Sequence, residues 1–194
     1  GFYPVGLNVW RRGEKECVPL YEGKMVQAYD HRAASIVVNP DNIHRPAQPK
    51  PASPEQHQNP KWLPTPQFWV ETPAVKPFHK LGWVLVFKEI TASTNMRTMI
   101  ASLAPFVAFG NKTPLLQPNQ DDEKGLKNYR LQAPLVLANL NAFAFDFIVR
   151  QKLHGQTLNL YILEQLPFIP PERFEQPIGG QKIADFIREQ VLNL

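Results

Sequence analysis

The sequence LGWVLVFKEI, residues 81–90, decides the fold class of this chain. It is rich in β-branched and aromatic residues, and both alternating sets of positions are apolar, which is typical of a strand buried on two faces. Residues 98–104 are predicted as a second strand that ends at Pro105. Two weaker strands are expected upstream, at residues 18–28 and 67–70. The N-terminal two-thirds of the chain is therefore predicted to form a sheet.

Helical periodicity replaces the strand pattern in the C-terminal third. Apolar residues recur there at spacings of four, three and four, as on one face of a helix, at Val136, Leu140, Phe143 and Phe147. Pro134 is expected in the first turn and Gly155 beyond the last. Asn139 and Asn141 offer places at which the segment divides into two helices. A last helix is predicted over residues 181–192.

The order of these elements predicts an α+β fold. Strands gather in the N-terminal part and helices in the C-terminal part, over about residues 133–194. We expect a mixed, largely antiparallel sheet and a single domain over residues 1–194, without internal repeats. A chain of 194 residues, of which 43% are hydrophobic, is long enough to bury a core without disulfides or metals.

The composition excludes several classes of protein. Cys17 is the only cysteine, which excludes a disulfide scaffold and a zinc ribbon. No run of about 18 apolar residues occurs, so no membrane-spanning helix is expected. The chain begins at Gly1 without an initiator methionine or a signal peptide, and we expect it to be a segment of a longer, cytoplasmic protein.

Proline is unevenly distributed along the chain. Ten of the twenty prolines lie between Pro40 and Pro77, mixed with Gln, Asn, His and Lys. Because proline fixes φ and lacks an amide hydrogen, neither a helix nor a central strand is expected to run through such a segment. Residues 39–66 are therefore predicted to form one long, extended loop. Loops of this length inside a domain often carry recognition.

Positive charge is concentrated upstream. Residues 1–120 contain 13 Lys and Arg against 8 Asp and Glu, a surplus of +5, whereas residues 121–194 contain 8 against 9. Such a surplus is compatible with a surface that faces a polyanion, and equally with ordinary solvation. Charge alone does not decide between them.

No catalytic motif is found in the chain. The five histidines lack the spacing of paired metal ligands, no serine stands in G-x-S-x-G, and no glycine-rich phosphate loop occurs. Asn59-Pro60-Lys61-Trp62 approaches the Asn-Pro-Pro-aromatic loop of amino-methylating DNA methyltransferases, but Lys61 replaces the second proline. We attribute this match to chance. The chain by itself is not expected to be an enzyme, and no cofactor or metal site is assigned to it.

Three segments together carry a resemblance to a known family, over about residues 18–172. They are Leu20-Tyr21-Glu22-Gly23-Lys24-Met25 with Tyr29-Asp30-His31-Arg32; Ile90-Thr91-Ala92-Ser93-Thr94-Asn95-Met96-Arg97-Thr98-Met99-Ile100 with Phe109-Gly110-Asn111; and Leu140-Asn141-Ala142-Phe143 with Phe145-Asp146-Phe147, Arg150-Gln151-Lys152 and Gln165-Leu166-Pro167. In this order and spacing they resemble the C-terminal specificity half of single-chain adenine DNA methyltransferases. These include fused type II restriction-modification enzymes and the BREX-like methyltransferases of phage exclusion.

The resemblance implies a target recognition domain for double-stranded DNA. A methyltransferase domain that binds S-adenosylmethionine and carries Asn-Pro-Pro-Tyr is then expected upstream, with a Mg-dependent nuclease where one is fused. The recognition domain would hold the duplex while that domain extrudes the target adenine. The chain departs from the family at Gln67-Phe68-Trp69, where Arg-Tyr-Trp is common, so no role is implied for this position.

The same resemblance suggests residues that contact DNA. Six polar residues are expected at the duplex, namely Lys24, His31, Arg32, Asn95, Arg97 and Lys112. Each also has a structural interpretation, as a solvated residue or as a tie across a turn. A group of aromatic residues is assigned to the core, with contact to the upstream domain as the alternative: Phe143, Phe145 and Phe147.

A protein-interaction module is the alternative function. Residues 46–54 and 64–66 would then offer polyproline II segments to the groove of a partner. An unrecognised stand-alone hydrolase is a third hypothesis, and no motif favours it.

Overall fold

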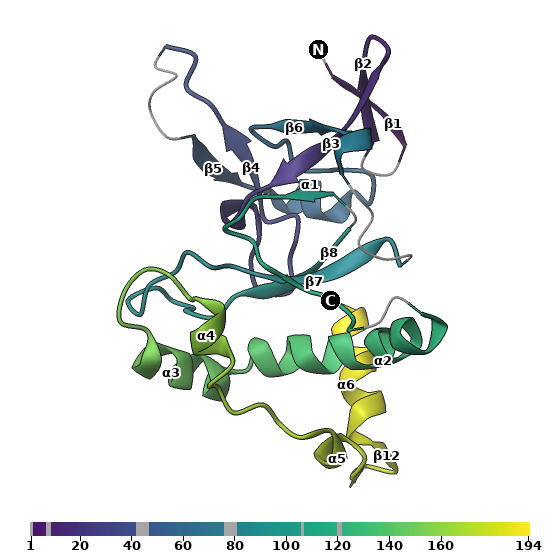
Figure 1. Cartoon of the computed structure of the whole chain (residues 1–194), viewed down its shortest axis with the longest axis vertical. Coiled ribbons are helices and arrows are strands. Elements are labelled where there is room, and N and C mark those ends of the chain that lie inside the picture. Colours follow the sequence, from purple (N-terminus) through teal and green to yellow (C-terminus); the bar gives the residue numbers. More distant parts are fainter. Residues whose placement is uncertain (1, 7–8, 42–46, 76–80, 106, 120–121) are drawn as a thin grey trace.

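A computed structural model of the chain describes residues 2–6, 9–41, 47–75, 81–105, 107–119 and 122–194 (Figure 1). Strands dominate the N-terminal part and helices the C-terminal part, which confirms the α+β class. Figure 1 shows the N-terminal strands at one end of the molecule, the C-terminal helices at the other, and a three-stranded sheet between them.

The strand predicted within residues 81–90 lies at the centre of the fold. This strand, β7 (Trp83–Phe87), pairs antiparallel with β8 (Ala101–Pro105) on one side and with β10 (Leu115–Leu116) on the other. Both neighbours protect its backbone hydrogen bonds from water. The apolar run therefore forms the middle strand of its sheet, where a continuous hydrophobic sequence is favoured.

Alternate side chains of β7 enter two different cores. Leu85 and Phe87 pack in the core under the C-terminal helices, whereas Val84 and Val86 pack in the core of the N-terminal part. All four side chains are almost fully buried. The prediction of a strand buried on both faces is confirmed. β7 lies between the two cores and contributes side chains to each of them.

A second sheet forms the N-terminal end of the molecule. Its antiparallel strands follow the order β1 (Tyr3–Gly6), β2 (Val9–Arg12), β3 (Lys15–Tyr21) and β6 (Trp69–Glu71). A short strand, β9 (Ala108–Phe109), joins the end of β3 in parallel. The sheet is thus mixed and largely antiparallel, as predicted. A 3₁₀ turn, η2 (Thr72–Ala74), follows β6.

The strand predicted at residues 18–28 ends early. β3 stops at Tyr21, and a 3₁₀ turn, η1 (Gly23–Met25), follows, in which the Met25 amide donates to the Glu22 carbonyl at 2.8 Å. Met25 and Val26 are fully buried in the N-terminal core. Their apolar side chains suggested a longer strand, but they fill a core from a turn.

The proline-rich segment is not one long loop, and this prediction was wrong. β5 (Gln48–Pro51) pairs antiparallel with β4 (Ala34–Val37), and helix α1 (Pro54–Gln58) follows. β5 is an edge strand of a two-stranded sheet, so its prolines interrupt no ladder on the outer side. Residues 42–46 of the predicted loop lie outside the described part of the chain.

Helix α1 begins with a strong capping signal, which the number of prolines in the segment does not reveal. Pro54 occupies its first turn, where a missing amide hydrogen is harmless. Ser53 and Gln56 form a capping box: the Gln56 amide donates to Ser53 Oγ at 3.2 Å, and the Ser53 amide donates to Gln56 Oε1 at 2.9 Å. Prolines at edge and first-turn positions therefore permit regular structure.

The helical part begins earlier than about residue 133, which corrects that prediction. Asp122 caps helix α2 (Glu123–Leu140), and its carboxylate accepts an amide hydrogen bond from the first turn at 2.6 Å. Pro134, expected in the first turn, lies inside α2. Helix α3 (Phe143–Lys152) follows a break at Asn141, as predicted. No single helix among the described residues is long and apolar enough to cross a membrane; α2 and α3 pass only as a pair bent by 66°.

After α3, two short helices precede a longer last helix. α4 (Leu160–Leu163) and α5 (Pro171–Phe174) each span about one turn. A hairpin of β11 (Pro177–Ile178) and β12 (Gln181–Lys182) leads into α6 (Ile183–Leu192), which packs against α2. The predicted last helix is confirmed apart from its first two residues, which belong to the hairpin.

A cluster of hydrogen-bonded polar side chains joins the start of β8 to the break between α2 and α3. Asp146 Oδ1 accepts hydrogen bonds from two backbone amides ahead of β8, both at 2.7 Å, and Oδ2 accepts one from Arg150 Nε at 2.8 Å. The Asn141 amide group bonds the backbone of Ala101 at 3.0 and 2.9 Å. We call Asp146, Arg150, Asn141 and the adjacent Arg97 the Asp146 junction.

Candidate functional site

Three pockets share lining residues and therefore adjoin. The lysine pocket, of about 460 Å³, takes its name from Lys24, Lys88 and Lys112. The middle pocket, of about 720 Å³, shares with it the residues Gly110, Asn111 and Thr113. The amide pocket, of about 460 Å³, shares with the middle pocket the residues Asn159 and Tyr161. We call these three pockets together the pocket row.

The frame of the lysine pocket is set by backbone hydrogen bonds between three segments. Gly110 donates to the carbonyl of Tyr21 at 2.9 Å, which ties the turn at residues 110–113 to the end of β3. The Glu89 amide donates to the Lys112 carbonyl at 3.2 Å, which ties the same turn to the end of β7. The pocket thus lies where three segments distant in sequence meet.

Close packing in this frame favours glycine at position 23. A Cβ atom there would lie 3.1 Å from the Lys112 carbonyl oxygen and 3.2 Å from Lys88 Cγ. Both distances are shorter than ordinary van der Waals contact. Gly23 therefore lets η1 approach the turn at residues 110–113 and the side chain of Lys88 closely.

The three lysines differ in their partners. Lys24 Nζ is 3.0 Å from Glu22 Oε2 and donates to the carbonyl of Ala47 at 3.0 Å. Lys112 Nζ is 3.3 Å from a carboxylate oxygen of Glu89. Lys88 is partly buried, and its ammonium has no hydrogen-bond or ion-pair partner among the residues that the structure describes. Burial lowers the pKa of Lys88 below its ordinary value.

Two further polar atoms at this pocket lack partners. Thr113 is 1% exposed, and its hydroxyl makes no hydrogen bond within the described part of the chain. Glu22 Oε1 is buried without a partner, although Oε2 of the same carboxylate pairs with Lys24. Buried polar atoms are nearly always hydrogen-bonded in folded proteins, so unsatisfied atoms that border one pocket make it a candidate for a polar ligand or bound water.

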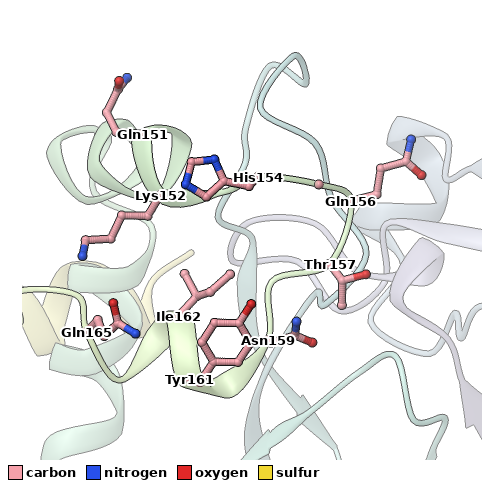
Figure 2. Close-up of a pocket in the computed structure, with 10 residues that line it drawn as sticks. Gln151, Lys152, His154, Gln156, Thr157, Asn159, Tyr161, Ile162 and Gln165 are labelled. Carbon is pink, nitrogen blue, oxygen red and sulfur yellow. The ribbon is translucent and has the colours of Figure 1, made fainter.

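The amide pocket is lined by polar side chains from the end of α3, the following loop and α4. Figure 2 shows Lys152 and Gln165 on one side of the Tyr161 ring, and Thr157 and Asn159 on the other. None of the ten residues that line this pocket is an aspartate or a glutamate. Amide and hydroxyl groups both donate and accept hydrogen bonds, so the lining suits a polar ligand.

The amide pocket is attached to the end of the central strand. The loop that forms it donates from Leu158 to the carbonyl of Glu89 at 2.7 Å, and accepts at the Gln156 carbonyl from the Thr91 amide at 3.0 Å. Glu89 directly follows Lys88 in the chain. The segment after β7 therefore positions both ends of the pocket row.

The structure brings two of the six predicted contact residues into the pocket row. Lys24 and Lys112 come from separate sequence segments and both line the lysine pocket. Lys88 was missed by sequence reasoning. The available signal was its position directly after an apolar strand, at the point where burial gives way to solvent.

His31 and Arg32 lie elsewhere and are engaged within the protein. The Arg32 guanidinium donates to three carbonyls that follow or end α1, at 2.9, 3.0 and 3.3 Å, those of His57, Asn59 and Trp62. His31 is largely buried, and this burial lowers its pKa to about 4. At neutral pH it is therefore uncharged. The hydrogen bonds of Arg32 order the proline-rich segment beside it.

Asn95 and Arg97 belong to the turn that the Asp146 junction holds. Arg97 donates to the Asn141 carbonyl, and its guanidinium carbon lies 4.6 Å from the centre of the Phe143 ring. Asn95 Nδ2 is 3.5 Å from Thr91 Oγ1. Burial opposes the charge of Asp146, but hydrogen bonds from backbone amides and Arg150 outweigh it and hold its pKa below the ordinary value.

The aromatic residues of α3 divide between core and surface. Phe145 is buried in the helical core, whereas Phe143 is 82% and Phe147 63% exposed. The assignment to the core is therefore confirmed for Phe145 and wrong for the other two. Positions 143 and 147 lie one helical turn apart on the outer face, away from the buried stripe.

The described ranges contain no group of three or more His, Cys, Asp or Glu residues able to hold a metal ion.

Comparison of the chain with family models, with curated proteins and with solved structures finds no match. The geometry of the pocket row is therefore the basis on which a function is argued.

Proposed function

We propose that the chain is the target recognition domain of an adenine-specific DNA methyltransferase of the type II restriction-modification or BREX-like kind. The observation that carries the proposal is the pocket row. It places an unpaired ammonium, two further lysines and a series of amide and hydroxyl side chains along one continuous surface. The resemblance of the sequence supports the same function, since Lys24 and Lys112 come from two of its segments.

The two ends of the pocket row suit different parts of a duplex. Lysines bind phosphate oxygens and fix the register of a protein on DNA without reading sequence. Asn, Gln and Thr side chains recognise base edges, and Asn or Gln matches adenine with two hydrogen bonds. We assign the lysine pocket to the backbone, and the amide pocket, through Asn159, Gln156 and Gln165, to the bases.

In this function the chain positions DNA and performs no bond-making step. Methyl transfer belongs to the upstream domain, where S-adenosylmethionine would bind and the extruded adenine would be held. Duplex contacts on the recognition domain stabilise the complex in which that base leaves the stack.

The alternative of a protein-interaction module has less support. The prolines that the structure describes in its first segment are exposed, but this stretch already has regular structure: residues 48–51 pair as β5, and Pro54 opens α1. Pro64 and Pro66 are buried. A partner groove that binds polyproline II needs these prolines exposed.

Salt-dependent binding of duplex DNA tests the proposal. Fluorescence anisotropy with a labelled mixed-sequence duplex is expected to show log Kobs falling with log salt by about 0.9 per phosphate contacted. Lys152→Met is expected to weaken binding, whereas Lys127→Met, on the exposed face of α2 outside the pocket row, is the matched control. Binding that ignores salt, or none by this chain and by the full-length protein that carries it, would overturn the proposal.

A further inference from the structure

The lysine pocket contains a charge that the protein does not compensate. The Lys88 side chain is partly buried, and no described residue pairs with its ammonium. Removing an ammonium from water is unfavourable unless other groups replace the lost hydration. Lysines with such surroundings are usually paired, so the arrangement predicts a ligand that brings an acceptor oxygen.

The charges around Lys88 define the charge of that ligand. Lys24 pairs with Glu22 at 3.0 Å and Lys112 with Glu89 at 3.3 Å. Three positive groups against two negative groups leave a surplus of one, and Lys88 is the group without a partner. A phosphodiester carries a single negative charge and balances this surplus. A phosphate dianion would exceed it.

Thr113 supplies a second donor beside this charge. Its side chain is 1% exposed and lines the pocket, and its hydroxyl has no partner in the described ranges. A Cβ atom added to Gly23 would lie 3.2 Å from Lys88 Cγ and 3.8 Å from Thr113 Oγ1, so both side chains border the same glycine. Lysine and threonine are common donors to the phosphate oxygens of DNA.

We infer that the lysine pocket binds one phosphodiester group of a DNA backbone, with the Lys88 ammonium and the Thr113 hydroxyl donating to its non-ester oxygens. The inference deepens the proposed function and rests on it, because the phosphodiester belongs to the duplex. Lys24 and Lys112 lie at the sides of the pocket, where their carboxylate partners hold them. Lys88 is thus a positioning residue that anchors the register of the duplex.

Proton binding accompanies this contact. Burial lowers the pKa of Lys88, and an anion in the pocket raises it again, so binding takes up protons where the free site is partly neutral. The charged groups that line the pocket with Lys88 are Glu22 directly before η1, Lys24 in η1 and Lys112 in the turn at residues 110–113, and Glu89 is next in the chain. Binding therefore weakens as the pH rises toward the lowered pKa, before exposed lysines lose their charge.

Two substitutions at one position test the inference with the same mixed-sequence duplex. Lys88→Met removes the charge and keeps the length of the side chain, and it is expected to reduce the salt slope by about 0.9. Lys88→Arg keeps the charge at every pH of the experiment, so it is expected to retain the slope and to remove the weakening at alkaline pH. Lys127→Met is the exposed control and should match the unsubstituted protein.

The outcomes separate this inference from the proposed function. A Lys88→Met protein that binds with the full slope overturns the phosphodiester site and leaves the proposed function standing. An unsubstituted protein without salt-dependent binding overturns the proposed function itself. Inorganic phosphate is the second probe: if it raises the unfolding midpoint of the unsubstituted protein but not of Lys88→Met, while duplex binding ignores the substitution, the pocket is a free-phosphate site and the inference is wrong.

Discussion

The Asp146 junction and the lysine pocket use similar side chains in opposite ways. At the junction, the Asp146 carboxylate accepts three hydrogen bonds, and the guanidinium of Arg150 also donates to the carbonyls of Ser93 and Met96 at 2.7 and 2.6 Å. At the lysine pocket, the Lys88 ammonium and the Thr113 hydroxyl have no partner among the residues that the structure describes. Within the junction, Arg150 has an acceptor for each donating nitrogen and holds the fold, whereas Arg97 Nε is buried 3.8 Å from Asp146 Oδ1 without a hydrogen bond among the described residues. The Lys88 ammonium has neither an ion pair nor a hydrogen bond in the described part of the chain, so it is available to a ligand.

The largest expected effect comes from removing the central carboxylate of the Asp146 junction. Asp146→Ala removes the acceptor from two backbone amides and from Arg150, and leaves buried donors unpaired. Removing one partner of a buried pair is expected to lower the free energy of unfolding by about 3 to 5 kcal/mol. Urea unfolding followed by circular dichroism measures it.

The control for this experiment is Asp185→Ala, which removes a surface ion pair with Arg188 at 2.9 Å. Exposed pairs contribute little, so the unfolding midpoint should hardly move. Equal effects of the two substitutions would show that the Asp146 junction is no more important to stability than a surface pair.

The next effect is a pH dependence carried by His31, another group engaged within the fold. Burial lowers its pKa to about 4 from an ordinary value of 6.5. The folded state therefore binds fewer protons than the unfolded state between these values, so this stability is fully present above pH 6.5 and is lost as the pH falls toward 4. The loss is expected to reach roughly 3 kcal/mol.

Unfolding of His31→Leu at several pH values measures this contribution by difference. The substituted protein should lose less stability between pH 6.5 and pH 4 than the unsubstituted protein, while His154→Gln, at an exposed histidine of the amide pocket, should not differ from it. If His31→Leu shows the same pH dependence as the unsubstituted protein, the histidine is not held neutral by burial.

The smallest expected effect is at Lys88, where a substitution is expected to raise the stability of the protein instead of lowering it. Lys88→Met replaces an uncompensated ammonium by an apolar group of similar length, so the free energy of unfolding is expected to rise by about 0.5 to 2 kcal/mol. Stabilisation accompanied by weaker DNA binding would mark Lys88 as a residue kept for a ligand. A loss of stability would mean that Lys88 has a structural role.

Local sequence signals predicted much of the fold because they depend on few residues. The run at β7 was recognised from its apolar positions alone, and the break at Asn141 from an interrupted helical pattern. The β4–β5 hairpin and α1 were missed, because the tolerance of a proline depends on whether its position needs an amide hydrogen. Composition does not contain that information.

The site was only partly predictable for a different reason. Lys24 and Lys112 could be nominated from sequence segments, but that they share a pocket with Lys88 follows from the meeting of three distant segments. Arginine is a common contact to DNA, but Arg32 and Arg97 both donate hydrogen bonds to backbone carbonyls within the fold. Whether a cation is free is decided by tertiary neighbours that a single sequence does not show.

The place of β7 between the two cores has a consequence for hydrogen exchange. Because its side chains pack into both cores, neither half of the molecule opens without disturbing this strand. Its amide hydrogens should therefore exchange with solvent only through global unfolding. The Lys88 amide, bonded to the Ile100 carbonyl at 2.9 Å, extends that protected segment to the edge of the lysine pocket. The Lys88 ammonium is thus attached to a segment that is expected to exchange slowly, and in the proposed function a duplex would meet it already in position.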